Sequence, residues 1–341
     1  MKYIGSSGKV YNTVDNVERK GGEGSVFDVE GDPNIVLKKY HDINKPSDKI
    51  SELMRQASGW DSEFKKWTVA PKDCVYDENN AFVGYTMKKL TGEFKALAEV
   101  YDMNEGKSIS YDNKVRTAIN LCFATYLAHK NNVVIGDYNQ KNIAVTPHGE
   151  VFLFDNDSFQ ITAGSKVYRC VVGVHEEMAP EIFGKLRREK ADLISVSSPV
   201  YNIYTDYYTL ALHVFHLLMN GAHPFNTKID ASKLPDSKTV SSVMLPLKTA
   251  AEKGVFAIAH PTLFYTRPSW VPKYEILSEG LRDCFERAFV DGLKDPVKRP
   301  TPAELFNALV EYLNGLEQLP CGHWHYKGYK DNCEWCRIYK K

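Results

Sequence analysis

The sequence predicts an α+β protein of two lobes, a small antiparallel β lobe followed by a larger helical lobe, with a short tail rich in cysteine and histidine. Alternation of apolar and polar residues marks the first quarter of the 341 residues. Apolar residues at helical spacing mark most of the remainder. We therefore predict a first lobe at 1–90, a second lobe at 91–318 and a tail at 319–341.

The β lobe is predicted from short alternating runs separated by glycines and turn residues. One helix interrupts these strands, because Ile50, Leu53 and Ala57 recur at helical spacing and Gly59 ends the pattern. The predicted strands lie at 26–29, 35–38, 75–76 and 82–87.

The second lobe is predicted to contain long helices, since apolar residues recur there at steps of three and four. A polar stretch at 226–250 has no such periodicity and is predicted to be a surface insertion. The predicted helices lie at 113–130, 206–219, 281–289 and 302–313.

Composition limits the possible partners. Lys+Arg and Asp+Glu each number 43, so no overall basic field favours nucleic acid or an anionic membrane, and we expect neither as a partner. The sequence starts without a signal-peptide-like apolar stretch, and no run approaches the roughly 18 apolar residues that a membrane span needs. Seven cysteines, an odd number, suit a reducing compartment. These features predict a cytoplasmic protein.

Three short motifs at fixed spacing carry the functional prediction. Asp137 is followed five residues later by Asn142, Asp155 comes eighteen residues after Asp137 at the end of an apolar strand, and the segment 178–181 reads MAPE. Phosphoryl transfer needs a carboxylate that orients the attacking hydroxyl and oxygen ligands for a divalent cation. Each of these residues could instead cap its own turn, but that reading does not explain the spacing.

These motifs resemble the active-site half of a protein kinase. The resemblance implies ATP as phosphoryl donor, Asp137 as the base, and Asn142 and Asp155 as ligands of Mg²⁺ or Mn²⁺. Asp157 is a competing carboxylate that could bind metal, but the step of thirteen residues from Asn142 selects Asp155.

The segment 20–26, KGGEGSV, resembles the glycine-rich loop of protein kinases. Glycines let backbone N–H groups approach the ATP phosphates, and an apolar residue covers the adenine. On its own such a segment is more often an ordinary hairpin turn. The residues implied here are Gly21, Gly22, Gly24 and Val26, with Arg19 at the position of the first glycine.

Lys38 closes an apolar strand and shares its face with Val36, which resembles the strand that presents the phosphate-pairing lysine of kinases. The alternative is a solvent-exposed strand lysine. The glutamate that pairs with this lysine in kinases is left open, because both Glu52 and Glu63 read better as solvated helix residues.

The strand at 82–90 resembles the connection between the kinase lobes. That resemblance implies Met87 at the back of the adenine pocket, with Lys88 and Leu90 contacting adenine.

The sequence departs from the kinase catalytic-loop motif at two places that affect the expected mechanism. Ile135 and Gly136 replace the His-Arg pair that precedes the kinase base, which argues against control by phosphorylation of the activation segment. Asn139 replaces a lysine near the transferred phosphate, and Asn139 or Lys141 could partly take over its role.

The resemblance also implies two supporting contacts. Glu181 should form a buried ion pair with Arg299, and Asp206 should bind the backbone of the catalytic loop. The alternative reading of Asp206 is a plain helix N-cap, which is compatible with that contact.

The tail combines a Cys-x₂-Cys pair with a further cysteine and two histidines, the ligand types and spacing of a structural zinc site. A tail of unpaired cysteines is the alternative. The predicted ligands are Cys321, His323, Cys333 and Cys336, with His325 as the alternative to His323.

Taken together, the chain resembles a bacterial group of atypical protein kinases linked with tellurium-resistance and stress operons. The resemblance implies a kinase fold, transfer of the γ-phosphate of ATP to Ser or Thr of a protein, a zinc-ribbon-like tail and possible operon partners. Two alternatives remain: a nucleotide-binding pseudokinase that acts as a scaffold, and a small-molecule phosphotransferase. The MAPE segment and Arg299 disfavour the second.

Overall fold

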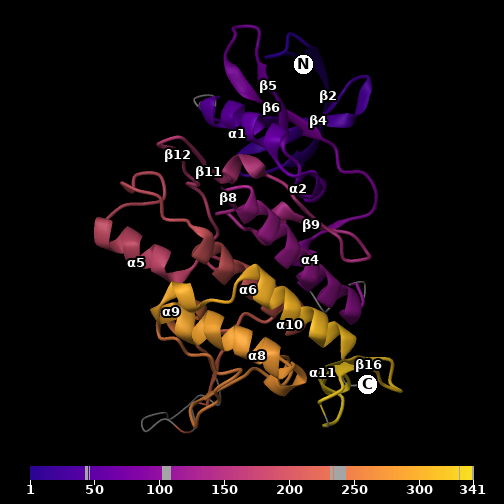
Figure 1. Cartoon of the computed structure of the whole chain (residues 1–341), viewed down its shortest axis with the longest axis vertical. Helices are drawn as coiled ribbons and strands as arrows, with labels where there is room; N and C mark the ends of the chain where they lie inside the picture. The colour runs from indigo at the N-terminus through magenta and orange to yellow at the C-terminus, as the bar shows by residue number, and fades with distance from the viewer. Residues whose placement is uncertain are drawn as a thin grey trace.

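Two lobes stacked along the long axis of the molecule are evident in the computed structural model (Figure 1). The structure describes residues 1–42, 45, 47–101, 109–230, 233, 243–329 and 331–339. The small N-terminal lobe is rich in strands and the large lobe is mostly helical, as the sequence predicts.

The small lobe is a closed antiparallel barrel with strand order β1-β2-β3-β4-β6-β5. Sequence reasoning missed β1, which closes the barrel by pairing with both β2 and β5. Two helices follow β4, namely α1 (Asp48–Gly59) and α2 (Ser62–Trp67). The strands are β1 (Lys2–Gly5), β2 (Val10–Lys20), β3 (Gly24–Val29), β4 (Asp32–Tyr40), β5 (Pro71–Tyr76) and β6 (Phe82–Lys88).

Helix α6 forms the centre of the large lobe, because it is buried along most of its length and packs against α4, which in turn packs against α10. The four predicted helices are present with ends shifted by a few residues, and the third continues through a π-helical stretch at 287–291. The helices are α3 (Leu97–Tyr101), α4 (Tyr111–Lys130), α5 (Pro180–Glu189), α6 (Ile203–Leu218), α7 (Leu247–Glu252), α8 (Glu279–Glu286), α9 (Gly292–Lys294) and α10 (Pro302–Asn314).

Two small sheets between the lobes position the kinase-like motifs. One contains β7 (Lys95–Ala96), β9 (Ile143–Val145) and β10 (Val151–Leu153), and the other β8 (Val133–Val134), β11 (Gln160–Ala163) and β12 (Lys166–Tyr168). The segment 137–142 connects β8 to β9, and the segment 155–158 connects β10 to β11. The two segments are therefore fixed at both ends.

The predicted insertion at 226–250 contains β13 (Lys228–Ile229), β14 (Val243–Met244) and α7, and β13 pairs with β14 and β15 (Tyr265–Thr266). Positions 231–232 and 234–242 of that prediction lie outside the described residues. The limits of the three predicted domains stay predictions.

The tail forms a hairpin of β16 (Leu316–Gln318) and β17 (Trp324–Tyr326) followed by α11 (Glu334–Tyr339), at the lower end of the large lobe (Figure 1). Trp335 is buried against Tyr111 at the start of α4, with ring centroids 5.1 Å apart. The hydroxyl of Tyr339 donates to Asn220 at 2.8 Å. The tail is thus packed onto the large lobe.

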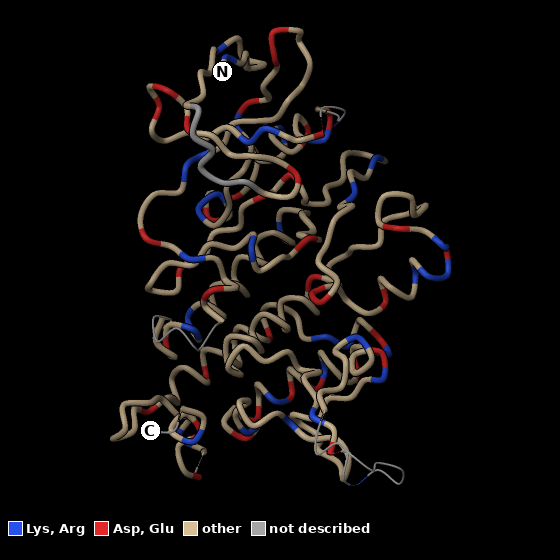
Figure 2. The backbone as a smooth tube through the Cα atoms, turned by 180° about the vertical axis from the view of Figure 1, so that it is seen from behind, with Lys and Arg blue, Asp and Glu red and all other residues tan. Residues whose placement is uncertain are grey.

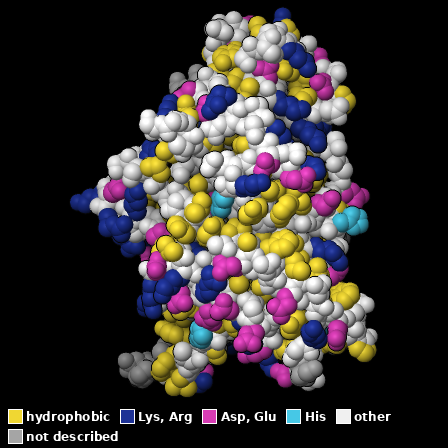
Figure 3. All heavy atoms as spheres, in the orientation of Figure 1, with side chains coloured by type: hydrophobic (Ala, Val, Ile, Leu, Met, Phe, Trp, Pro, Cys, Tyr) yellow, Lys and Arg dark blue, Asp and Glu magenta, His cyan; other side chains and the backbone are white. Residues whose placement is uncertain are grey.

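Acidic and basic residues are interspersed along both lobes (Figure 2), and both signs of charge occur on the face drawn in Figure 3. Within the described ranges, no helix has the length and apolar character needed to cross a bilayer.

Candidate active site

A cleft of about 490 Å³ lies between the lobes, and every residue predicted for nucleotide binding or catalysis lines it. Residues that sequence reasoning did not select also line it, among them Glu23, Val69, Phe94 and Val172. The predicted residues are Gly21, Gly22, Gly24, Val26, Val36, Lys38, Met87, Lys88, Leu90, Asp137, Asn139, Asn142 and Asp155.

In the β2–β3 turn, Gly21 and Gly22 leave the backbone open, and Gly24 allows the close approach of β4. The N–H of Gly21 donates to the carbonyl of Gly24 at 2.8 Å, and a Cβ at Gly22 would meet nothing within 4 Å. This part of the turn is therefore open toward the cleft. Gly24 has a structural reason to be glycine, because a Cβ there would lie 2.5 Å from the carbonyl oxygen of Lys39 on β4.

Lys38 lies at the centre of a buried network of charges and hydroxyls. Its Nζ donates to Asp157 at 2.9 and 3.0 Å and also contacts Asp155. Asp157 accepts from the hydroxyls of Tyr40 and Tyr85 at 2.6 and 2.8 Å. Burial alone would lower the pKa of Lys38, but the two carboxylates outweigh it and raise that pKa. Burial opposes the charge of Asp157 too, yet Lys38 and Tyr40 hold its pKa below the usual range.

Neither glutamate considered for Lys38 binds it in this structure. Glu52 accepts from Arg55 and Gln56 on its own helix, and Glu63 pairs with Lys66. Sequence reasoning missed the two tyrosines of the network, although strand geometry offered a signal. Tyr40 follows Lys38 by two residues and so shares its face, and Tyr85 is directly opposite Lys38 on β6.

The catalytic-loop segment brings Asp137 and Asn142 into contact, because the side-chain amide of Asn142 donates to Asp137 Oδ2 at 3.3 Å. Asn139 accepts from the N–H of Lys141 at 2.9 Å and so caps the short helix Gln140–Asn142. Burial, with the charges of Asp155 and Glu23, raises the pKa of Asp137 to about 6. Above that pH the group is a carboxylate, which can accept a proton.

Asp155 is held beside Asn142, because the N–H of Phe154 donates to the carbonyl of Asn142 at 3.0 Å. Its backbone is in the left-handed region, φ 62°, which Asp tolerates better than most residues and which recurs at functional sites. Burial and the nearby Asp157 raise the pKa of Asp155. An amide oxygen and a carboxylate at this spot are ligands that suit Mg²⁺ or Mn²⁺.

Both predicted supporting contacts are confirmed, but Asp206 is not a helix N-cap, because α6 begins at Ile203 and Asn202 caps it. Asp206 accepts from the N–H groups of Ile135 and Gly136 at 2.8 and 3.0 Å. Arg299, 1% exposed, binds both carboxylate oxygens of Glu181 at 2.7 Å. The start of the segment that carries Asp137 and the end of the MAPE segment are thereby anchored to the buried interior of the large lobe.

Gly136 occupies the position where protein kinases carry arginine. Its φ is +73°, and a Cβ there would lie 2.7 Å from the Cβ of Cys170. The ring of Tyr201 closes the same space. A longer side chain does not fit at this position without a shift of Cys170.

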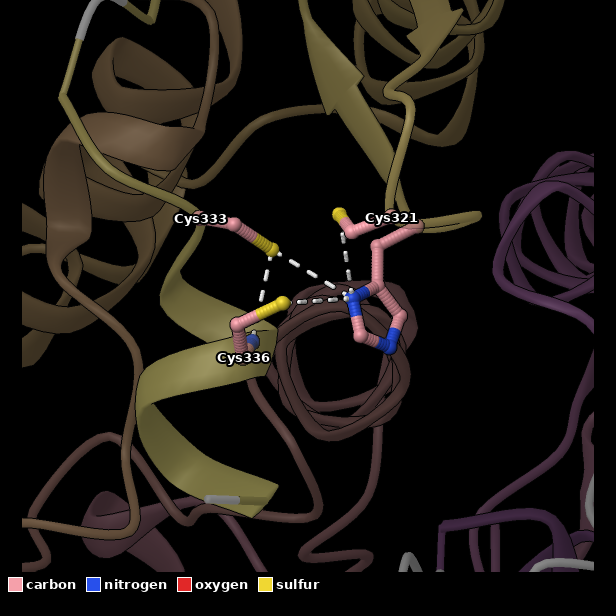
Figure 4. A group of neighbouring side chains, drawn as sticks. Cys321, Cys333 and Cys336 are labelled. Carbon is pink, nitrogen blue, oxygen red and sulfur yellow. Dashed lines mark hydrogen bonds between the residues drawn. The ribbon is translucent and has the colours of Figure 1, made fainter. Parts of the chain in front are cut away.

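The tail brings four of the five predicted zinc ligands together. Figure 4 shows the thiols of Cys321, Cys333 and Cys336 converging with one imidazole. The Nδ1 atom of His323 lies 3.6, 3.3 and 3.5 Å from the three sulfurs, and the four donor atoms lie within 4.8 Å of one another. Tetrahedral zinc with ordinary bond lengths separates sulfur and nitrogen by about 3.5 Å, so the set fits the ion.

His325, the alternative ligand, lies outside this set of four. Its Nε2 is 3.2 Å from the sulfur of Cys333, its ring stacks on Tyr329, and it is buried. This is the arrangement of a side chain that orients a metal ligand through a hydrogen bond.

Comparison with solved structures decides the fold. A rhoptry kinase from Toxoplasma gondii superposes with a TM-score of 0.58 over 92% of this chain and 83% of that one, at 10% sequence identity. The fold is that of a protein kinase.

Curated relatives agree with this fold. The chain is 24% identical over 344 residues to the Escherichia coli K12 protein named protein kinase YegI, and 25% identical over 325 residues to the protein of that name from strain O157:H7. These matches cover 99% and 94% of this chain, but the chain spans only about half the length of these relatives. No family model matches the chain. The tellurium-resistance grouping and the stress-operon partners stay predictions.

Proposed function

We propose that the chain is an ATP-dependent protein kinase that transfers the γ-phosphate to a Ser or Thr hydroxyl of a protein. The observation that carries the proposal is the convergence of Lys38, Asp137, Asn142 and Asp155 on one cleft below the glycine turn. Two named protein kinases with similar sequences, and the kinase fold itself, support it.

Each group has a role in this proposal. Gly21, Gly22 and Lys38 bind the phosphates, while Val26, Val36 and Met87 enclose the adenine. Asn142 and Asp155 hold Mg²⁺ or Mn²⁺, which neutralises phosphate charge when bound.

Asp137 orients the protein hydroxyl and accepts its proton as the oxygen bonds to the γ-phosphorus and ADP leaves. A protein substrate is favoured over a small molecule by the segment 173–181. The Glu181–Arg299 pair fixes that segment beside the loop carrying Asp137, since the N–H of Gln140 donates to Glu177 at 3.2 Å.

The test is transfer of label from γ-³²P-ATP into the protein itself and into a generic protein acceptor, with Mg²⁺ and separately with Mn²⁺. Asp137→Asn keeps the shape of the side chain and loses its basicity, so we expect the rate to fall by about 10²- to 10⁴-fold. Lys95→Gln, a substitution outside the cleft, is the matched control and should leave the rate unchanged.

Label that persists at the wild-type rate in Asp137→Asn would refute the assigned base. No label in the wild type, combined with ADP binding measured by calorimetry, would favour the pseudokinase alternative. Label entering only small hydroxyl compounds would favour the small-molecule phosphotransferase.

A further inference from the structure

Asp157 stands out among the buried charges, because it follows the metal-binding motif without belonging to it. We propose that Asp157 is the positioning carboxylate for Lys38, in the role that a glutamate of helix α1 would have in a typical protein kinase. The inference rests on the proposed function for the role of Lys38 toward phosphate, but not for the pairing itself.

The hydrogen bonds of Asp157 are directed entirely at the protein. Oδ1 accepts from Lys38 Nζ at 2.9 Å and from Tyr85 at 2.8 Å, and Oδ2 accepts from Lys38 at 3.0 Å and from Tyr40 at 2.6 Å. An ionised carboxylate can accept about four hydrogen bonds, and these four contacts fill all of its acceptor sites. Its side chain is 4% exposed, against 29% for Asp155. Both carboxylates contact Lys38, but Asp157 is buried and fully engaged with protein donors, whereas Asp155 is more exposed and can also bind a ligand in the cleft.

Helix α1 offers Lys38 no comparable partner. Both carboxylate oxygens of Glu52 accept from Arg55, one of them also from Gln56. The helix is tied instead to the segment after Asp157, because Gln56 donates to the carbonyl of Thr162 at 2.9 Å and Lys49 donates to that of Arg169 at 3.0 Å. The polar contacts of α1 therefore fix the helix to its neighbours without reaching Lys38.

One short segment therefore carries both carboxylates that contact Lys38, Asp155 and Asp157. Residues 156–158 form a single 3₁₀ turn, closed by the N–H and hydroxyl of Ser158 on the carbonyl of Asp155 at 3.1 and 2.9 Å. The same turn therefore holds both Asp155 and Asp157. The pairing of Lys38 should then not depend on the position of α1, the element whose movement controls the lysine–glutamate pair in regulated kinases.

The pairing can be tested without nucleotide by a double-mutant cycle of Lys38→Met and Asp157→Asn, read as the melting temperature. With Lys38 present, Asp157→Asn removes one of the two carboxylates that contact the buried ammonium group and leaves only Asp155, so we expect Tm to fall by on the order of 5 °C. In the Lys38→Met background the same change should cost much less. The matched control is Glu52→Gln, which should show no coupling to Lys38. Additive effects at 38 and 157, or coupling between 38 and 52, would overturn the proposal.

Titration calorimetry with ADP, in Mg²⁺ and in excess EDTA, tests the role toward phosphate. A displaced Lys38 contacts the nucleotide poorly with or without metal, so Asp157→Asn should weaken binding in both conditions, by roughly tenfold. Asp155→Asn serves as the reference for a metal ligand; because Asp155 also contacts Lys38, we expect a loss in both conditions that is clearly larger in Mg²⁺ than in EDTA. If Asp157→Asn showed that same pattern, Asp157 would be a metal ligand and the proposal would be wrong. A wild type that binds no ADP in either condition would refute the proposed function, while the melting cycle would still decide the pairing.

Discussion

In the cleft, the buried ammonium group of Lys38 is bound by a carboxylate 119 positions further along the chain, whereas the four candidate ligands of the tail lie between 321 and 336. Asp157 neutralises the charge of Lys38 from within the protein, and Tyr40 and Tyr85 complete its hydrogen bonds. In the tail, three sulfurs and one imidazole nitrogen converge on a single point. Three thiols and an imidazole at this spacing can hold a zinc ion.

The two regions should therefore differ in what stabilises them: internal charge pairs in the cleft and a bound metal ion in the tail. Lys38 and Asp157 should keep their geometry without a ligand, because these two buried charges are paired with each other. The tail is a hairpin with one short helix and a small core, and such units usually need a metal to fold. We therefore expect loss of metal and loss of an internal charge pair to act on different parts of the molecule.

The largest expected effect is removal of metal from the tail. Structural zinc sites bind with free energies on the order of 10 kcal/mol, and much of that energy is folding energy of the segment around the ion. Treatment with a strong chelator, or Cys336→Ser, should release bound zinc and increase amide exchange across 316–339. Exchange in 137–157 should not change. Atomic absorption and hydrogen exchange with mass spectrometry measure both.

His325→Gln is the matched control for the tail, since His325 contacts the sulfur of Cys333 from outside the set of four. It should keep the ion and weaken zinc binding by about 10- to 100-fold. A tail that stays protected in metal-free protein, or exchange that spreads into 137–157, would contradict the contrast between the two regions.

The second prediction concerns an internal pair that supports the cleft. Glu181→Gln leaves Arg299 buried with only a neutral partner, and Arg299 also donates to the carbonyls of Tyr204 and Gly292 at 2.8 Å. Breaking a buried pair costs about 3–5 kcal/mol, and we expect the lower figure because the side chain of Glu181 is 32% exposed. The effect should appear as a lower Tm and faster exchange near 173–181, with zinc content unchanged.

Glu252→Gln provides the control for this pair. Glu252 pairs with Arg187 on the surface at 3.5 Å, with both side chains well exposed, so its loss should change stability by less than about 1 kcal/mol. Equal effects of Glu181→Gln and Glu252→Gln would mean that the buried pair contributes no more than a surface contact.

The fold could be predicted from the sequence where the signal is local. The spacing of apolar residues located α4 and α10 to within a few residues, because a helix repeats its buried face every three to four positions. Strand β1 was missed, since four residues carry little periodicity and its pairing with β5 joins the two ends of the barrel. The short strands flanking the catalytic segments were mostly missed for the same reason.

In the candidate site, too, local motifs could be predicted from the sequence, and a contact between distant segments could not. Motif spacing was enough to select Asp137, Asn142 and Asp155, and Cys-x₂-Cys spacing was enough to select the tail cluster, because each motif lies within one short stretch. The partner of Lys38 could not be found in this way. The search was confined to glutamates of the two helices after β4, whereas the contact with Asp157 depends on how two lobes meet.

The smallest effect is expected at Glu177, a carboxylate beside the cleft that is only partly paired. It is 7% exposed, and its Oε1 has no hydrogen-bond partner among the described residues. Burial, together with the charges of Asp137 and Glu176, raises the pKa of Glu177 to about 7, against the effects of the Gln140 N–H and Lys141. The folded protein therefore binds a proton here at pH values where the unfolded chain has released it. Stability from this group is present below the ordinary pKa of 4.5 and is lost as pH rises toward 7.

Glu177→Gln should remove this pH dependence. Between pH 5.5 and 8.5 the carboxylate costs the wild type about 2 kcal/mol of stability, so the Tm of the variant relative to wild type should rise over that range. The exposed neighbour supplies the control, since Glu176→Gln should shift the curve little. A difference in Tm that stays flat with pH would show that Glu177 is ionised at no cost. In that case the protein itself would stabilise the ionised carboxylate of Glu177. The contrast with the tail, whose ligands we expect to need a metal ion, would then be sharper.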